Sequence, residues 1–228
     1  MKTLSTLFVV IVLFASCKNQ KNTSEEHSDT MAKDSAEQPI AERMAYANGF
    51  ENFSNINELD FTFNVKTNDT LRVSRAWKWW PKEDKVQLIE KQDTVTYNRK
   101  DQMDDSSMNA DKKFVNDSYW LLFPFQIMWS DNTIKESATT DAPISGNKMN
   151  SFTVSYSKEG GYTPGDSYQV FYESGTPMIK EWTYNSSDGR SLSTTWEDYE
   201  TFKGIKISKM HNNADGSFQL YFTDIKAE

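Results

Sequence analysis

Residues 61–80 read Phe-Thr-Phe-Asn-Val-Lys-Thr-Asn-Asp-Thr-Leu-Arg-Val-Ser-Arg-Ala-Trp-Lys-Trp-Trp. Apolar side chains recur at every second position on both sides of Asn68-Asp69, a period that is typical of strands with one buried face. Asn and Asp favour tight turns because they tolerate the left-handed backbone conformation. The stretch therefore predicts an antiparallel hairpin. Its inner faces would carry Phe61, Phe63 and Val65 on one strand and Leu71, Val73, Arg75, Trp77 and Trp79 on the other.

Short segments with the same period follow along most of the chain. Strands are predicted at 86–89, 94–97, 152–156, 168–172, 178–184, 191–196, 204–210 and 218–225. Asp188-Gly189 and Asp215-Gly216 are strong hairpin turns, since glycine accepts the positive φ that such turns require. The 14 Phe, 10 Tyr and 7 Trp also favour β structure. We expect a mainly β (α+β) fold of about ten strands in a single domain at residues 39–228.

Two short helices interrupt the strands in this prediction. The first spans residues 39–48, where Ile40 and Met44 share one face and Gly49 is placed to end the helix. A second helix is predicted at 111–119, where apolar residues recur at helical spacing.

Between these elements the chain has two long polar stretches. Residues 98–113 are interpreted as an exposed loop or lid, and 130–150 as a second polar break in the strand pattern. The apolar run 120–125 between them should be buried. Three acidic residues in the first stretch lack the glycine and the final bidentate glutamate of a calcium loop, so no metal site is predicted from Asp101, Asp104 and Asp105.

The N-terminus has the layout of a lipoprotein signal peptide. Lys2 precedes an unbroken apolar run at 7–15, which ends at Ser16 and Cys17 and is shorter than the roughly 20 residues that span a membrane. The end of the run resembles the bacterial lipobox, in which the thiol receives a diacylglyceryl group before cleavage. We expect removal of residues 1–16 and anchoring through two or three acyl chains on Cys17. An ordinary signal peptide with a coincidental cysteine is the alternative.

Residues 17–38 are predicted to be the lipidated cysteine and a flexible tether, because they are polar and lack aromatic side chains. His27 lies in this tether and is interpreted as solvated. Cys17 is the only cysteine, so no disulfide and no thiolate metal site is expected. These features predict a cell-envelope protein that is lipid-anchored in the outer membrane, on either its periplasmic or its surface face.

The overall charge excludes some partners. A formal net charge of -8 at pH 7 argues against nucleic-acid binding, which needs a basic surface. It also argues against electrostatic adhesion to anionic lipid headgroups. The acyl anchor is therefore the expected membrane contact.

Three stretches that follow the predicted N-terminal helix along the chain resemble one known group of proteins. They are FVNDSYWLL at 114–122, GYTPGDSY at 161–168 and WEDYETFKGIK at 196–206. With them, the chain resembles bacterial lipoproteins of the lipoprotein-localisation (Lol, LolA/LolB) carrier-like superfamily. The resemblance implies a half-open antiparallel β-barrel of about 10–11 strands, with short helices as a lid or plug.

In that superfamily the concave apolar face holds acyl chains or other hydrophobic ligands, so the resemblance implies a hydrophobic ligand here. The predicted cavity-lining residues are Ile40, Met44, Phe61, Phe63, Val65, Trp77, Trp79, Trp120 and Leu122. Bulky aromatics are also the usual packing material. The alternative is a filled barrel, which would leave a scaffold or interaction role in the envelope. A lipidated Cys17 would tether the chain, as in the membrane-bound receptor of the superfamily and unlike its soluble carrier.

No catalytic constellation stands out. His27 lies in the tether and His211 beside the turn at 212–216, where it is interpreted as solvated, so neither offers a Ser/His or His/His pair. A hydrolase with paired carboxylates is a weaker alternative; its candidates are Asp166, Glu173, Glu181, Glu197 and Asp198. The sequence therefore predicts a binding protein without enzymatic activity, cofactor or metal.

Overall fold

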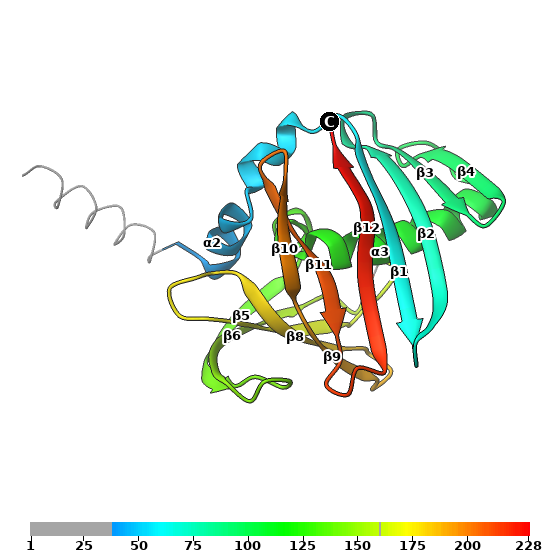
Figure 1. The fold of residues 1–228 in the computed structure, drawn as a ribbon. Coiled ribbons are helices and arrows are strands. Elements are labelled where there is room, and N and C mark those ends of the chain that lie inside the picture. Colours follow the sequence, from blue (N-terminus) through cyan, green and yellow to red (C-terminus); the bar gives the residue numbers. More distant parts are fainter. Residues whose placement is uncertain (1–37, 160) are drawn as a thin grey trace, which may run out of the picture. The chain divides into compact units, whose positions relative to one another are not determined.

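The computed structural model describes residues 38–159 and 161–228. The predicted signal peptide, Cys17 and the tether up to residue 37, including His27, lie outside the described residues. Gln38–Glu228 forms one compact unit. Its described part contains twelve strands in two antiparallel sheets, with helices α2 and α3 (Figure 1).

The first sheet has seven strands in the order β10-β11-β12-β1-β2-β3-β4. They are β10 (Glu197–Phe202), β11 (Ile205–Asn212), β12 (Phe218–Ala227), β1 (Leu59–Thr67), β2 (Thr70–Trp80), β3 (Lys85–Glu90) and β4 (Asp93–Asn98). The hairpin predicted from residues 61–80 is confirmed as β1 and β2, with Thr67 paired to Thr70. Asn68 and Asp69 have φ of 48° and 59°, as a two-residue hairpin turn requires.

The second sheet has five strands in the order β5-β6-β7-β8-β9. They are β5 (Thr133–Asp141), β6 (Lys148–Ser155), β7 (Ser167–Tyr172), β8 (Ile179–Asn185) and β9 (Ser191–Thr195). The predicted turn between β8 and β9 is confirmed: Gly189 has φ of 90°, and Ser186 N–H donates to the Arg190 carbonyl at 2.8 Å.

The chain passes from the second sheet to the first at Trp196, between β9 and β10. Trp196 N–H donates to the Lys180 carbonyl of β8 at 2.8 Å. Asn212 N–H of β11 donates to Thr195 Oγ1 of β9 at 3.0 Å, so the two sheets meet along these strands. The outer strands β4 and β5 do not pair with each other within the described residues. The result is a half-open antiparallel barrel, which confirms the predicted fold class.

Helix α3 (Asp105–Trp129) connects β4 to β5 and lies between the two sheets (Figure 1). Leu121, Leu122 and Phe125 pack in a cluster with the seven-stranded sheet. Phe123 and Ile127 pack in a second cluster with the five-stranded sheet. One helix thus fills the space between the sheets, as the plug implied by the resemblance would, but at 25 residues it is not short.

A kink divides α3. Leu122 has non-helical angles (φ -129°, ψ 32°), two residues before Pro124. Proline lacks the N–H that would bond to the preceding turn, and its ring crowds the carbonyl there. The predicted helix at 111–119 and the buried run at 120–125 are therefore the two sides of one bent helix.

The predicted N-terminal helix is confirmed as α2 (Ile40–Ala47), followed by the short 3-10 helix η1 (Phe50–Asn55). Between them, Gly49 has φ of 83°. A Cβ at Gly49 would stand 2.0 Å from the carbonyl oxygen of Gly204, so this position needs glycine for its backbone angle and for space.

The interpretation of residues 98–113 as an exposed loop is wrong for most of its length, because α3 begins at Asp105. Asp104 caps the helix: its Oδ1 accepts the Ser107 N–H at 2.8 Å, which lowers the pKa of this carboxyl. The buried face of α3 carries Asp111 and Asp117 beside its apolar residues. These charges weakened the helical pattern in the sequence.

Two strands were missed, β5 and β10. Both are outer strands, and most of their side chains are exposed and polar. An edge strand with solvated side chains shows no alternation of apolar residues. The stretch 130–150 is therefore a strand and a connection, not a break in the sheet. A short 3-10 helix, η2 (Pro81–Glu83), occupies the connection from β2 to β3.

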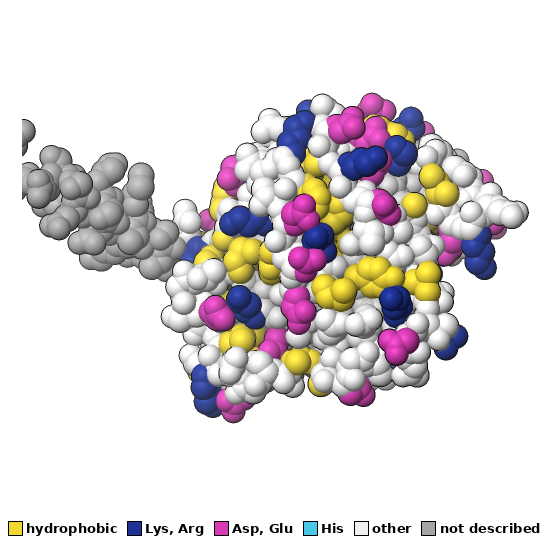
Figure 2. Space-filling model, viewed as in Figure 1, with side chains coloured by type: hydrophobic (Ala, Val, Ile, Leu, Met, Phe, Trp, Pro, Cys, Tyr) yellow, Lys and Arg dark blue, Asp and Glu magenta, His cyan; other side chains and the backbone are white. Residues whose placement is uncertain are grey.

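Acidic and basic side chains are interspersed on the face shown in Figure 2, which presents the seven-stranded sheet. Apolar side chains lie between them, and no large patch of one sign forms there. This face has no extended basic surface of the kind that nucleic acids require.

Candidate functional site

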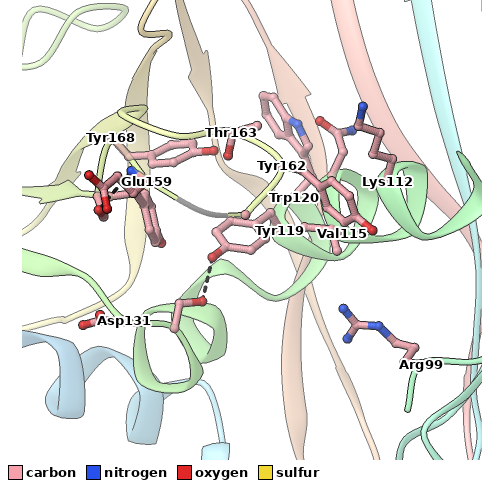
Figure 3. Close-up of a pocket in the computed structure, with 15 residues that line it drawn as sticks. Arg99, Lys112, Val115, Tyr119, Trp120, Asp131, Glu159, Tyr162, Thr163 and Tyr168 are labelled. Atoms are coloured by element: carbon pink, nitrogen blue, oxygen red, sulfur yellow. Dashed lines mark hydrogen bonds between the residues drawn. The ribbon is translucent and has the colours of Figure 1, made fainter. Parts of the chain in front are cut away.

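Two neighbouring cavities lie along α3. We call the first the tyrosine cavity, because Tyr119, Tyr156, Tyr162 and Tyr168 line it (Figure 3). Its volume is about 460 Å³. We call the second the tryptophan cavity; it holds about 480 Å³ and is lined by Trp79 and Trp129 together with Phe53 and Phe114. The two share Arg99, Val115, Tyr119 and Ser130 as lining residues.

Three tyrosines form the inner wall of the tyrosine cavity. The ring of Tyr119 lies 5.9 Å from that of Tyr156 and 6.4 Å from that of Tyr168, and Tyr156 and Tyr168 lie 6.0 Å apart. The Tyr156 hydroxyl is buried and has no hydrogen-bond partner among the described residues. Burial raises the pKa of Tyr156, so this hydroxyl keeps its proton. An unpaired buried hydroxyl costs about 1–3 kcal/mol, which a polar ligand atom would offset.

The connection between β6 and β7 lies beside the tyrosine cavity and is fastened to α3 through Asp111. Tyr162 in this connection donates its hydroxyl to Asp111 Oδ2 at 2.9 Å. Asp111 Oδ1 accepts Arg99 Nε at 2.8 Å and the Tyr97 hydroxyl at 3.2 Å. The buried carboxylate of Asp111 thus joins three separate segments at one side of the cavity.

The tryptophan cavity is built from aromatic rings in tilted and edge-to-face contact. Phe53 lies 5.3 Å from Trp79 and 4.8 Å from Trp129, and Trp79 lies 5.2 Å from Phe114. Such pairs contribute about 0.5–1.5 kcal/mol beyond the area that they bury. Trp129 remains 42% exposed, so this cavity presents an aromatic surface to solvent.

Tyr119 and Ser130 stand where the two cavities meet. Their hydroxyl oxygens are 2.6 Å apart, and both residues line both cavities. This hydrogen bond is drawn as a dashed line in Figure 3. Rotation of either side chain would change the connection between the two cavities.

The position of α3 is fixed by a buried carboxylate, Asp117. It accepts Arg75 Nε at 2.8 Å, Arg75 Nη2 at 2.6 Å and Trp77 Nε1 at 2.8 Å. Arg75 and Trp77 are two residues apart and lie on the same inner face of β2, as the sequence predicted. The bidentate pair holds the helix, and with it the lining residues of both cavities, against the seven-stranded sheet.

The interpretation of His211 as a solvated turn residue is wrong. It belongs to β11, and its side chain is fully buried against Trp196, Trp120 and Phe222, with ring centroids 4.5, 5.3 and 6.0 Å away. Nδ1 lies 3.1 Å from the Thr195 carbonyl oxygen, and since a carbonyl only accepts, Nδ1 carries the proton. Desolvation lowers the pKa of His211 to about 3, so the ring is neutral at physiological pH.

The structure distributes the predicted cavity residues over both cavities and the packed interior. Trp120 lines the tyrosine cavity and Trp79 the tryptophan cavity. Five others lie in or against the cluster of the seven-stranded sheet: Phe61, Phe63, Val65, Trp77 and Leu122. Ile40 and Met44 pack in the cluster of the five-stranded sheet. The sequence thus named one lining residue of each cavity, and the prediction that the rest line ligand space stays a prediction.

The tyrosines of the first cavity were missed, although the sequence carried a signal for two of them. Tyr156 shares the inner face of its predicted strand with Phe152 and Val154, and Tyr168 begins the predicted strand that pairs with it. An aromatic hydroxyl at the end of an apolar face is typical of a cavity rim. The place of Tyr119 in the cavity could not be predicted from the sequence, because it depends on how α3 packs between the sheets.

The carboxylates named for a hydrolase have structural partners. Asp166 accepts the Tyr184 hydroxyl at 2.6 Å and the Ser187 N–H at 3.0 Å. Glu181 accepts the N–H groups of Ile144 and Ser145. Glu173 pairs with Lys180, Glu197 accepts a hydrogen bond from Asn212, and Asp198 pairs with Lys209.

Two further properties of the described residues bear on the site. No cluster of three or more His, Cys, Asp or Glu side chains there is arranged to hold a metal ion. No helix in the same part of the chain has both the length and the hydrophobicity to cross a lipid bilayer.

No known protein family and no curated protein matches this sequence. The structure is similar to that of a DUF1329 family protein from Desulfovibrio piger, with a TM-score of 0.46 and 9% identity over 83% of this chain and 90% of that chain. It is also similar to a LolA superfamily protein from Nitrosomonas europaea, with a TM-score of 0.46 and 9% identity over 84% of this chain and 94% of that chain. A third likeness is to a putative outer membrane lipoprotein-sorting protein domain from Vibrio parahaemolyticus, with a TM-score of 0.44 and 11% identity over 83% and 91%.

At identities of 9 to 11% these likenesses concern the fold alone. The function has to be argued from this chain's own residues.

Proposed function

We propose that this chain is a cell-envelope lipoprotein, anchored through acylated Cys17, whose half-barrel binds a hydrophobic or amphipathic small molecule without covalent chemistry. The observation that carries the proposal is the pair of neighbouring cavities along α3. Each has a volume in the range of about 300–1,000 Å³ that is usual for small-molecule sites. Each has five aromatic side chains in its lining, together with polar and charged groups.

The chemistry of the lining favours a greasy ligand with a polar end. Apolar ligand surface gains about 25 cal/mol for each Å² removed from water, and Trp129, Trp79 and Phe53 offer such a surface. The unpaired Tyr156 hydroxyl in the adjoining cavity offers a donor to a polar atom. An acyl chain with a headgroup combines the two properties.

The first experiment asks whether the protein retains such a ligand. A chain lacking residues 1–16 and carrying Cys17→Ser is purified gently, and its native mass spectrum is compared before and after organic extraction. A discrete adduct that disappears on extraction supports the proposal. A ligand-free mass, together with no uptake of added myristic acid, contradicts it.

A pair of variants links retention to the cavities. Trp129→Glu replaces an aromatic wall of the tryptophan cavity with a charge. Bound apolar ligand would cover this charge without giving it a partner, which is unfavourable, so the adduct should be lost. Leu71→Glu is the matched control, because Leu71 is 50% exposed at the start of β2 and lines neither cavity. Equal retention in both variants would place the ligand elsewhere.

A second experiment tests the anchor. Full-length protein is produced in a bacterium that processes lipoproteins, and the envelope is fractionated. Wild-type protein should stay with the membrane and carry the mass of acyl chains, whereas Cys17→Ser should be released. Release of both forms would favour an ordinary signal peptide with a coincidental cysteine.

One observation favours the scaffold alternative. Residues of α3 pack into both hydrophobic clusters and fill the space between the sheets. If the remaining cavities hold only water, the barrel is filled, and the outer surface would have to carry the function. The ligand-retention experiment separates the two proposals.

A further inference from the structure

Charged side chains of opposite sign stand on opposite sides of the tyrosine cavity. Figure 3 shows Arg99 and Lys112 on one side, and Asp131 and Glu159 on the other, with Tyr119 between them. Arg99 follows β4 and Lys112 lies on α3, whereas Asp131 precedes β5 and Glu159 follows β6. One side of the cavity is therefore positively charged and the other negatively charged, although the four lining charges sum to zero.

The cationic side has donors to spare. Arg99 Nε–H donates a hydrogen bond to Asp111, and its terminal nitrogens form no hydrogen bond within the described residues. Its guanidinium lies over the ring of Phe114 at 5.4 Å, which holds the group in place. Lys112 forms no ion pair in the described part of the chain and lies 5.9 Å from the ring of Tyr162. Planar guanidinium and ammonium donors together suit a phosphate.

The anionic side suits a small cation. The carboxylates of Asp131 and Glu159 form no ion pair with another described residue. Figure 3 shows Tyr119 between the two charged sides, and Tyr156 and Tyr168 line the same cavity. The faces of such rings attract an ammonium group by the cation–π interaction. The buried Tyr156 hydroxyl, which has no partner among the described residues, could donate to a phosphate oxygen.

We infer that the tyrosine cavity takes a zwitterionic headgroup of the phosphoethanolamine type, attached to an acyl chain that occupies the tryptophan cavity. The inference rests on the proposed function and names its ligand class. The phosphate faces Arg99 and Lys112, and the ammonium faces Asp131 and Glu159.

A ligand with a single charge fits less well. A simple anion would satisfy Arg99 and Lys112 but leave the two carboxylates facing it across the cavity. A simple cation would be attracted by Asp131 and Glu159 but would leave Arg99 and Lys112 facing it across the cavity. A neutral headgroup would gain from neither side. Only a headgroup with both charges is attracted by both walls.

The test compares amphiphiles that share one chain and differ in charge. The probes are myristoyl lysophosphatidylethanolamine, myristyl phosphate, myristyl trimethylammonium and myristyl maltoside, all below their micelle concentrations. Glycerophosphoethanolamine, which has the headgroup without a chain, is the fifth probe. Affinities are measured by titration calorimetry on the chain lacking residues 1–16 with Cys17→Ser.

We expect the zwitterionic lipid to bind about fivefold more tightly than any of the other three amphiphiles. Lys112→Gln should weaken the zwitterion and the anion by about two- to fivefold, and Asp131→Asn should weaken the zwitterion and the cation. Lys135→Gln and Asp69→Asn are the matched controls, since both residues are exposed and line neither cavity. They should change nothing.

Every other pattern overturns the inference, and the patterns differ in what they mean for the proposed function. Equal binding of all four amphiphiles, unchanged in the variants, leaves a hydrophobic site without headgroup selection. Tightest binding of a singly charged probe gives a different headgroup class. If glycerophosphoethanolamine is the only probe that binds tightly, the cavity recognises the headgroup and the acyl chain makes no contribution. No binding of any probe refutes the proposed function as well.

Discussion

Replacing Asp117 by Ala tests the contact that holds α3 between the sheets. The Asp117 side chain is completely buried, and that of Arg75 is 13% exposed. Asp117 accepts two hydrogen bonds from Arg75, one from Trp77 Nε1 and one from Asn116 Nδ2. The substitution removes all four acceptor contacts while leaving the donors where they are.

The magnitude follows from what stays behind. Breaking a buried ion pair by removing one partner costs about 3–5 kcal/mol, because the other charge is left uncompensated. The Trp77 N–H adds the cost of an unpaired buried donor, part of which water entering the vacated space would offset. We expect Asp117→Ala to lower the free energy of unfolding by about 3–5 kcal/mol.

The double variant Arg75→Met with Asp117→Leu is the control. It removes both charges and restores apolar volume, and such replacements are often neutral or stabilising. Two donors lose their acceptor: Asn116 is exposed and can bond to water, whereas the buried Trp77 N–H is left unpaired at a cost of about 1–3 kcal/mol. The double variant should therefore be more stable than Asp117→Ala alone, which is the reverse of what additive damage would give.

Urea unfolding followed by tryptophan fluorescence measures these differences by linear extrapolation. The chain lacking residues 1–16 with Cys17→Ser serves as reference. A loss of under about 1 kcal/mol in Asp117→Ala would refute the idea that this pair fixes the helix. A double variant less stable than the single one would refute the electrostatic explanation.

Three further predictions concern the frame of the cavities. Since the pKa of His211 is about 3 when folded and 6.5 when unfolded, the unfolded state binds the proton first as the pH falls; stability should drop by about 2 kcal/mol between pH 6.5 and 5, and urea titrations of His211→Phe should lack this drop. Tyr162→Phe removes the hydrogen bond to Asp111 and should speed proteolytic cleavage of the β6–β7 connection, with a global loss of only about 0.5 kcal/mol; an unchanged cleavage rate would contradict this. Gly49→Ala meets the Gly204 carbonyl and a positive φ, so it should lower the free energy of unfolding by about 2 kcal/mol or more, and an unchanged urea midpoint would show that the backbone there can relax.

The hairpins could be predicted from the sequence because their signal is local. Asn68-Asp69 and Asp188-Gly189 mark turns whose backbone angles these residues favour, and the alternation around them reports one buried face. The edge strands β5 and β10 could not be found this way. Their pairing partners hold them in the sheet, but their side chains are solvated and carry no periodic signal.

The site was harder to predict because it depends on contacts between distant segments. Trp79 and Trp120 were identified, since large aromatics on an inner face are conspicuous. Tyr119, Tyr156 and Arg99 come from a helix, a strand end and a connection that meet only in the folded chain. His211 was wrongly predicted to be solvated because the turn next to it is polar, whereas its own side chain points into a tryptophan-rich interior.

The bend of α3 explains why free volume remains where it does. Tyr119 and Ser130 are eleven residues apart, which in a straight helix would separate their backbones by about 16 Å. Their hydroxyls nevertheless meet at 2.6 Å, because the kink at Leu122 turns the second half of the helix back toward the first. The buried side chains of α3 fill the space between the sheets. The two cavities remain on the other side of the bend, where Tyr119 and Ser130 line both of them. A ligand in these cavities would therefore lie against the bend of the helix and not deep within the strands, so a filled interior is compatible with the proposed binding site.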